Sequence, residues 1–182
     1  MGKCTLILGG IRSGKSGFAE DLVKNNVTSV IYLATGQQTD FEMSQRIQIH
    51  QERRPQSWTT LEEPIDMVSK LRTKLCRENT CGVVLLDSLD GWTSNYLIEH
   101  EDEDYKIVES SALEHLSCFV NLIKESNTDA FIVSSEVGSG LVSTYSLGRR
   151  FQDLLGVLNQ TAAAESEVVY LVTAGIPVKL KG

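Results

Sequence analysis

Unbroken runs of hydrophobic residues, rather than alternating ones, recur along this chain. They occupy residues 4–8, 29–34, 83–86, 130–133 and 168–172. A continuous apolar run bounded by polar residues is typical of a strand that is buried on both faces, as the strands of a parallel sheet are. We therefore predict that these segments form one mainly parallel sheet.

Between these runs, hydrophobic residues repeat at helical spacing. One set is Val108, Ala112, Leu116, Phe119, Val120 and Ile123, in a helix predicted over 105–126. A second set is Leu147, Phe151, Leu154, Leu155 and Leu158, and residues 17–24 are predicted to start a further helix. Strands that alternate with helices predict an α/β fold with right-handed crossovers, in which ligands bind at the carboxyl ends of the strands.

Composition and charge argue against two classes of protein, those that span a membrane and those that bind nucleic acid. The chain has 182 residues, 41% of them hydrophobic, and a formal net charge of −7, which suits one domain over 1–182 with its own core. No stretch approaches the ~20 apolar residues of a membrane span. A first strand that begins near residue 4 leaves no room for a signal peptide, so we expect a cytoplasmic protein. An acidic chain without a dominant basic patch argues against nucleic acid as a partner.

The cysteines give little indication of a metal site. They stand at positions 4, 76, 81 and 118. None forms a C-x-x-C pair, and no histidine lies at zinc-ligand spacing from Cys76 and Cys81. We therefore interpret the cysteines as reduced thiols, in preference to zinc ligands.

One segment carries the strongest chemical signal. It reads Gly9-Gly10-Ile11-Arg12-Ser13-Gly14-Lys15-Ser16 and matches G-x-x-x-x-G-K-[ST], the phosphate-binding loop, between a predicted strand and a predicted helix. A loop in that position presents backbone N–H groups to an anion at a helix N-terminus. Lys15 is expected to reach the β- and γ-phosphates, and the Ser16 hydroxyl to bind Mg²⁺. A bound nucleoside triphosphate is therefore favoured over an ordinary glycine-rich turn.

A second group of residues lies in 41–54, which is predicted as a helix that ends before a proline. Helical spacing places Arg46 and His50 on one face, with Arg53 and Arg54 about one turn further on. Guanidinium groups bind phosphate oxygens. Their charge disfavours protonation of His50, whose free lone pair can then attack phosphorus. From spacing alone, however, an ordinary surface helix with an exposed histidine is the better interpretation.

The other histidines carry weaker signals. His100 lies in the acidic run 99–104, whose carboxylates are expected to face solvent rather than converge on a metal. His115 lies in the predicted helix 105–126 without cationic neighbours, and we interpret it as a structural residue.

Carboxylates follow several predicted strands. Asp87 comes directly after the run 83–86 and is the expected anchor for Mg²⁺ beside a phosphate-binding loop. Asp90 is a candidate cap for the segment after it. Glu62 is a candidate for contact with a sugar hydroxyl or the metal. Glu136 is expected to end the fourth strand, and its glycine-rich loop is either a substrate-closing segment or a plain connection.

These pieces, in this order, resemble the bifunctional adenosylcobinamide kinase/adenosylcobinamide-phosphate guanylyltransferase family of cobalamin assembly. The matching segments span essentially the whole chain: GGIRSGKS at 9–16, YLATG at 32–36, EMSQRIQIHQERRPQSWTTLE at 42–62, VVLLDSL at 83–89, SSEVGSGLV at 134–142, FQDLLGVLNQ at 151–160 and VYLVTAGIPVKLKG at 169–182. The phosphate-binding loop is common to many families, whereas the 42–62 string and the EVG-x-G-x-V loop are specific to this one.

The resemblance implies a RecA-type phosphate-loop fold and a trimer with active sites near subunit interfaces. Such enzymes phosphorylate the aminopropanol hydroxyl of adenosylcobinamide, with GTP or ATP as donor. They then transfer GMP from GTP to that phosphate through a guanylylated histidine, and release pyrophosphate; the matching histidine here is His50. The residues that would contact the nucleotide are Gly9 to Ser16, Thr35, Gly36, Gln37, Gln51, Glu52, Arg53, Arg54, Glu62 and Asp87.

Two alternatives differ from this interpretation. A monofunctional small-molecule kinase would need the phosphate-binding loop but not His50. A nucleotide-dependent switch protein would use a D-x-x-G loop, and residues 153–156 spell one, but they lie inside a predicted helix, and no N-K-x-D string is present to recognise guanine. The chain departs from the family at Asp90, Ser143 and Val157, where threonine, proline and arginine are frequent.

Overall fold

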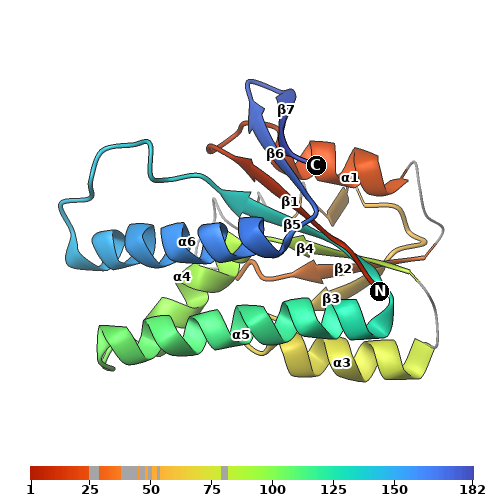
Figure 1. The fold of residues 1–182 in the computed structure, drawn as a ribbon, viewed down its shortest axis with the longest axis horizontal. Coiled ribbons are helices and arrows are strands. Elements are labelled where there is room, and N and C mark those ends of the chain that lie inside the picture. Colours follow the sequence, from red (N-terminus) through yellow and green to blue (C-terminus); the bar gives the residue numbers. More distant parts are fainter. Residues whose placement is uncertain (25–28, 38–44, 46–47, 49–50, 53, 79–81) are drawn as a thin grey trace.

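The computed structural model describes residues 1–24, 29–37, 45, 48, 51–52, 54–78 and 82–182. Within them lies a seven-stranded sheet in the order β3-β2-β4-β5-β1-β6-β7 (Figure 1). The strands are β1 (Cys4–Gly9), β2 (Val30–Ala34), β3 (Thr59–Glu62), β4 (Val83–Asp87), β5 (Asp129–Ser135), β6 (Val168–Thr173) and β7 (Ile176–Lys181). All neighbours from β3 to β6 pair in parallel, and β7 runs antiparallel to β6. Every predicted strand is present, so the prediction of a mainly parallel α/β fold is confirmed.

Helices cover both faces of the sheet. They are α1 (Lys15–Lys24), α3 (Met67–Glu78), α4 (Leu89–Glu99), α5 (Tyr105–Ser126) and α6 (Ser146–Glu165). Helices α3 to α6 contribute to the core on one face, and α1 contributes to the core on the other (Figure 1). The predicted helix over 105–126 is confirmed at both ends, and the D-x-x-G string at 153–156 lies inside α6.

The apolar runs are explained by this two-sided burial. On β1, Leu6 packs in one core and Ile7 in the other; on β2, Leu33 and Tyr32 divide in the same way. Successive side chains of a strand point to opposite faces, so a strand covered on both faces needs an unbroken apolar sequence.

Two strands were not predicted from the sequence, because neither is an apolar run. Strand β3 has only four residues and alternates between half-buried and exposed positions. Strand β7 is exposed along its whole length. It joins β6 through a turn in which Ala174 and Gly175 have positive φ angles, of 52° and 80°. The β6–β7 turn matters for the site, because the Gly175 N–H donates to the Ser13 carbonyl at 2.8 Å.

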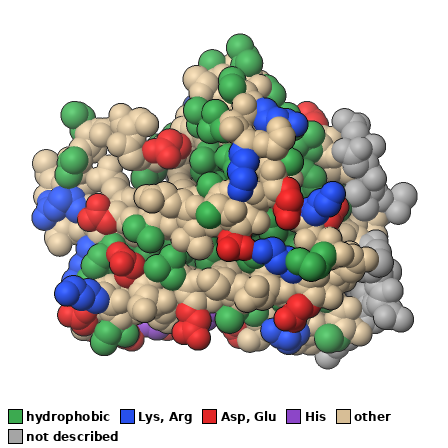
Figure 2. All heavy atoms as spheres, in the orientation of Figure 1, with side chains coloured by type: hydrophobic (Ala, Val, Ile, Leu, Met, Phe, Trp, Pro, Cys, Tyr) green, Lys and Arg blue, Asp and Glu red, His purple; other side chains and the backbone are tan. Residues whose placement is uncertain are grey.

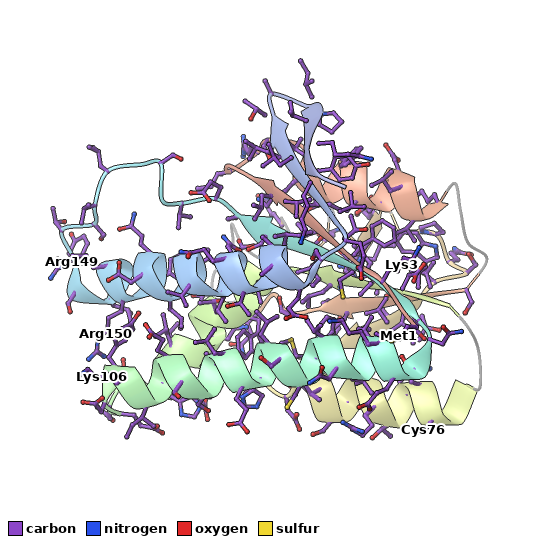
Figure 3. All side chains as sticks on the ribbon, viewed as in Figure 1. Met1, Lys3, Cys76, Lys106, Arg149 and Arg150 are labelled. Atoms are coloured by element: carbon purple, nitrogen blue, oxygen red, sulfur yellow. The ribbon has the colours of Figure 1, made fainter. Side chains whose placement is uncertain are left out.

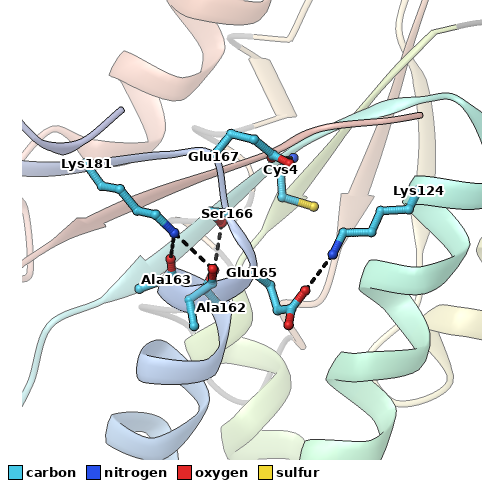
Figure 4. Close-up of polar contacts among 9 residues, drawn as sticks. Cys4, Lys124, Ala162, Ala163, Glu165, Ser166, Glu167 and Lys181 are labelled. Carbon is cyan, nitrogen blue, oxygen red and sulfur yellow. Dashed lines mark hydrogen bonds and ion pairs between the residues drawn. The ribbon is translucent and has the colours of Figure 1, made fainter.

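Polar contacts tie the elements together where β1 begins (Figure 4). The backbone N–H of Cys4 donates to Glu167 Oε2 at 2.7 Å. Lys124 of α5 pairs with Glu165 at the end of α6. Lys181 of β7 donates to the carbonyls of Ala163 and Ala164 in the last turn of α6, which suits a cation at a helix C-terminus.

The amino ends of α5 and α6 are joined by basic and aromatic side chains. Figure 3 shows Arg149, Arg150 and Lys106 near one another at this end of the molecule. The Arg150 guanidinium lies 5.6 Å from the centre of the Tyr105 ring, and Arg149 donates to the carbonyls of Ser143 and Thr144. The segment 143–145 before α6 is therefore held to the first turn of that helix.

The structure confirms the interpretation of His115 and gives detail on the acidic run. His115 packs 5.4 Å from Tyr96 and 6.0 Å from Trp92, measured between ring centres, so it contributes to an aromatic cluster. In the acidic run, His100 ends α4 and contacts Glu103 at 2.8 Å. Residues 101–104 are an exposed turn between α4 and α5, as the solvated-loop prediction required.

Cys4, Cys76 and Cys118 are free thiols, and Cys81 lies outside the described residues. Across the described part of the chain, none of the helices has the length and apolarity to span a bilayer.

Candidate functional site

The predicted site residues that the structure describes gather at one edge of the sheet. The last residues of the parallel strands β1 to β5 are Gly9, Ala34, Glu62, Asp87 and Ser135. Parallel strands end at the same edge, and this is where α/β proteins bind ligands. The phosphate-binding loop follows β1, residues 35–37 follow β2, and Glu136 follows β5. Its N–H donates to the Gly9 carbonyl at 3.0 Å.

Close packing and backbone angles explain Gly9 and Gly14, two of the three glycines of the loop. A Cβ atom on Gly9 would lie 2.4 Å from Ser13 Oγ and 2.7 Å from the carbonyl oxygen of Val172. Gly14 has a φ of 94°, in the region that other residues avoid. Arg12 adopts a positive φ of 56° as well. The chain therefore makes a tight loop before α1 begins at Lys15.

The loop has the properties of an anion site. The first N–H groups of a helix have no partners within the helix, and they point toward the loop. Ser13 Oγ is buried and has no hydrogen-bond partner among the described residues, and a phosphate oxygen would satisfy it. Lys15 Nζ lies 3.4 Å from the Gly10 carbonyl, so the ammonium folds back over the loop. Ile11 and Arg12 are exposed.

Asp87 joins the loop to the end of β4. The Ser16 hydroxyl donates to Asp87 Oδ1 at 3.3 Å, and the Tyr32 hydroxyl donates to Asp87 Oδ2. A hydroxyl and a carboxylate oxygen are the ligand types that Mg²⁺ prefers. The residues present therefore fit a magnesium ion, which Ser16 and Asp87 would hold.

Tyr32 also contacts residues at and just after the end of the predicted 41–54 helix. The Arg54 guanidinium lies 3.7 Å from the centre of the Tyr32 ring, and Trp58 stacks near it at 6.1 Å. Burial, followed by the negative charge of Asp87, raises the pKa of the Tyr32 phenol far above its usual value. Tyr32 is therefore protonated and acts as a donor. The apolar run 29–34 predicts Tyr32 only as a strand residue, and the one signal for a further role is a phenol among aliphatic side chains.

Thr35 supports the turn after β4 rather than facing solvent. It is buried, and its hydroxyl donates to the Ser88 carbonyl at 2.7 Å and accepts from the Ser88 N–H at 2.9 Å. The side chain of Asn95 donates to the Thr35 carbonyl at 2.7 Å. Gly36 and Gln37, which follow, are exposed at the edge of the sheet.

The end of the predicted 41–54 helix also reaches this edge. Gln51 donates to Glu62 Oε1 at 3.2 Å, and Glu52 accepts from Gln48 at 2.9 Å. Gln51 and Glu52 are helical and Arg54 is not, which agrees with the predicted helix end. The remaining residues of this prediction, Arg46, His50 and Arg53, lie outside the described residues.

The prediction that Asp90 caps the helix after it is wrong. The N-cap of α4 is Ser88, whose side chain accepts from the Gly91 N–H at 3.2 Å. Asp90 lies in the first turn, where its carboxylate accepts from the N–H and the hydroxyl of Ser135, at 3.1 and 2.8 Å. The buried Asn159 side chain donates to the Ser135 carbonyl. Asp90 therefore fixes the end of β5, which lies between β4 and β1.

The loop after Glu136 is held locally but exposes apolar side chains. Glu136 Oε1 accepts from the Gly138 N–H at 2.7 Å. Beyond it, Leu141, Val142 and Tyr145 are largely exposed. The loop thus leaves the phosphate-binding edge as a polar turn and continues as an apolar surface.

The chain is similar in sequence to known proteins along nearly its whole length. A sequence model of the family described as cobinamide kinase/cobinamide phosphate guanyltransferase matches residues 5–180. A bifunctional adenosylcobalamin biosynthesis protein CobP of Pseudomonas aeruginosa is 38% identical, with 97% of this chain and 96% of that protein covered. The CobU proteins of Escherichia coli and Salmonella typhimurium, which carry the same bifunctional description, are each 33% identical, with 97% of this chain and 98% of each protein covered. The chain therefore belongs to the cobinamide kinase/cobinamide phosphate guanyltransferase family.

Proposed function

We propose that this protein phosphorylates adenosylcobinamide and then transfers GMP from GTP to adenosylcobinamide phosphate, giving adenosylcobinamide-GDP and pyrophosphate. GTP or ATP serves as the phosphate donor, and residues 1–182 act as one nucleotide-binding domain in the cytoplasm. The observation that carries the proposal is the contact between Ser16 and Asp87 at the edge where the phosphate-binding loop lies, in a chain of this family.

In the kinase step, the chain positions phosphates and neutralises charge. The loop N–H groups and Lys15 hold the β- and γ-phosphates. Ser16 and Asp87 would hold Mg²⁺, which would supply charge neutralisation at the transferred phosphate. The acceptor hydroxyl of cobinamide attacks the γ-phosphorus in line, the bond to the bridging oxygen breaks, and the nucleoside diphosphate leaves.

In the transfer step, His50 acts as the nucleophile. Its neutral imidazole attacks the α-phosphorus of GTP and expels pyrophosphate, which leaves GMP on the ring nitrogen. A phosphate oxygen of adenosylcobinamide phosphate then attacks the same phosphorus and restores the free histidine. The contact of Gln51 with Glu62 supports this role, because Gln51 is adjacent to His50 in the chain and meets the edge of the sheet where phosphates bind. Arg54 supplies a cation on the ring of Tyr32, whose hydroxyl donates to Asp87.

Labelling by the nucleotide tests this function. The protein is incubated with GTP labelled at the α-phosphate, denatured, and mapped by mass spectrometry. We expect an acid-labile GMP adduct on His50, its loss in His50→Ala, and retained kinase turnover in that variant. His100→Gln, which changes a histidine in the turn after α4, serves as the control and keeps the adduct. A kinase that forms no adduct and releases no pyrophosphate would instead be a monofunctional enzyme.

We also propose that the protein forms a homotrimer. Within the described residues, strand β7 is an edge strand that pairs only with β6, and it exposes Ile176, Val178 and Leu180. Figure 2 shows hydrophobic side chains gathered over the β6–β7 hairpin at the top of the view. Such an edge favours association with another chain. Sedimentation equilibrium tests the proposal, and a monomer at micromolar concentration would contradict it.

A further inference from the structure

We propose that Tyr32 is a positioning residue of the nucleotide site, whose hydroxyl aims the Asp87 carboxylate at Ser16 and whose ring supports Arg54. This inference rests on the proposed function, because it assigns Tyr32 a part in holding the magnesium nucleotide. Tyr32 would not touch the substrate; it acts through its two neighbours.

The hydroxyl fixes the orientation of Asp87. Tyr32 is buried in the strand next to β4, at 1% exposure, so its ring has little freedom to move. Its O–H donates to Oδ2 of Asp87, while Oδ1 faces the Ser16 hydroxyl at 3.3 Å. A carboxylate anchored through one oxygen presents the other in a constant direction. In other metal sites, the carboxylates that bind the metal are likewise held in position by hydrogen bonds from neighbouring residues.

The ring face gives the Arg54 side chain its position. The guanidinium stacks on the Tyr32 ring with its carbon 3.7 Å from the ring centre, well within the range of a cation–π contact. Arg54 Nε is buried without a hydrogen-bond partner among the described residues. Stacking on the Tyr32 ring is therefore a main contact that positions the guanidinium. A rigid aromatic strand residue therefore links a basic segment to the phosphate-binding edge.

A purely structural role for the phenol predicts a different pattern. A buried tyrosine needs a partner for its hydroxyl wherever it lies. Tyr96 shows this, since its hydroxyl pairs with the Ser111 hydroxyl at 2.7 Å, between α4 and α5. The hydroxyl of Tyr32 pairs instead with the predicted metal ligand. Removal of either hydroxyl should cost similar stability, but only the Tyr32 change should alter how binding of a nucleotide depends on magnesium.

The test compares Tyr32→Phe with the matched control Tyr96→Phe in the full chain. Isothermal calorimetry measures the affinity for a non-hydrolysable GTP analogue, with excess Mg²⁺ and with EDTA. We expect the affinity of Tyr32→Phe in EDTA to stay within twofold of the wild type. The factor by which Mg²⁺ increases the affinity should be about tenfold smaller in Tyr32→Phe than in the wild type, as expected for the loss of one hydrogen bond to a charged group. Tyr96→Phe should keep the full gain. Circular dichroism of both variants confirms that they are folded.

A second variant, Tyr32→Leu, tests the ring. Relative to Tyr32→Phe, it should bind the analogue at least threefold more weakly in EDTA, because Arg54 loses its aromatic support. A full magnesium gain in Tyr32→Phe would overturn the role of the hydroxyl, and equal affinities of the Phe and Leu variants in EDTA would overturn the role of the ring. A wild-type protein without any magnesium gain would overturn the metal site of the proposed function together with this inference.

Discussion

The Ser16 hydroxyl lies 3.3 Å from Oδ1 of Asp87, although 71 positions separate the two residues in the chain. Ser16 belongs to the first turn of α1, and Asp87 is the last residue of β4. Their contact brings the helix that follows the phosphate-binding loop to the carboxylate that ends a strand. In the proposed function the chemistry of the site depends on this contact, and the following predictions test its parts.

Replacement of the loop lysine should impair both reactions. We expect Lys15→Ala to lower kcat/KM about 10²–10³-fold in the kinase and the transfer step, the usual effect of removing one group that stabilises developing charge. The measurement is steady-state kinetics of phosphate transfer and of pyrophosphate release. Lys3→Ala, at the opposite end of β1, is the control and should behave as wild type. Unchanged kinetics of Lys15→Ala would rule out a catalytic role for the loop.

Neutralisation of the carboxylate that ends β4 should remove most of the response to magnesium. Asp87→Asn keeps the shape and one oxygen but loses the charge. We therefore expect it to raise the Mg²⁺ concentration for half-maximal activity at least tenfold and to lower kcat. The free energy of unfolding should change by only about 1 kcal/mol, because an amide oxygen can still accept one hydrogen bond. Asp153→Asn, at an exposed position on α6, is the control. A magnesium titration that matches the wild type would contradict the assignment.

Gly14, in the phosphate-binding loop, and Gly17, in α1, allow a matched test of backbone strain. Gly14 has a φ of 94°, and a Cβ there would lie 3.3 Å from Gly175 Cα. Gly14→Ala should therefore destabilise the protein by about 1–2 kcal/mol and weaken nucleotide binding. Gly17, in α1, has open space around its Cβ position, so Gly17→Ala should be neutral or stabilise by up to about 1 kcal/mol. Urea unfolding of both variants measures the difference, and equal losses would show that backbone strain is not the cause.

The buried thiol of Cys4 should make stability fall at alkaline pH. Burial, with Glu167 as the next cause, raises the pKa of this thiol from 9.0 to about 12. Above pH 9 the unfolded chain releases the thiol proton while the folded chain retains it, so the free energy of unfolding decreases as pH rises toward 12. The contribution is about 1.4 kcal/mol per pH unit in that window.

Cys4→Ala should remove this part of the pH dependence. Urea unfolding between pH 7 and 10.5 should give a shallower decrease above pH 9 for this variant than for the wild type. Cys118→Ala, which removes an exposed thiol, should keep the wild-type slope. Parallel curves for the wild type and Cys4→Ala would contradict the raised pKa.

Much of the fold could be predicted because buried strands and helices require hydrophobic residues at characteristic positions in the local sequence. The apolar runs became β1, β2, β4, β5 and β6, since strands covered on both faces need continuous hydrophobic sequence. Strand β7 could not be predicted from hydrophobicity, because it is exposed. Its pairing with β6 is specified by the turn at Ala174 and Gly175. The cap of α4 was assigned to Asp90 instead of Ser88, because both residue types favour that position and only the helix start decides between them.

In the site too, some features could be predicted from local sequence and others could not. The phosphate-binding loop, Asp87 and Glu62 could be named from motif and strand position, and the structure brings them to one edge. The hydrogen bond from Tyr32 to Asp87 and the stacking of Arg54 on Tyr32 could not, because they depend on which strands become neighbours.

The sequence by itself determined most of the elements and the kinds of chemical group, because hydrophobic periodicity and the loop motif act over a few residues. Tertiary structure decided which of those groups meet, because strand order and register are set by packing across the whole sheet. Tyr32 lies opposite Leu85, two positions before Asp87, only in the register that β2 and β4 adopt.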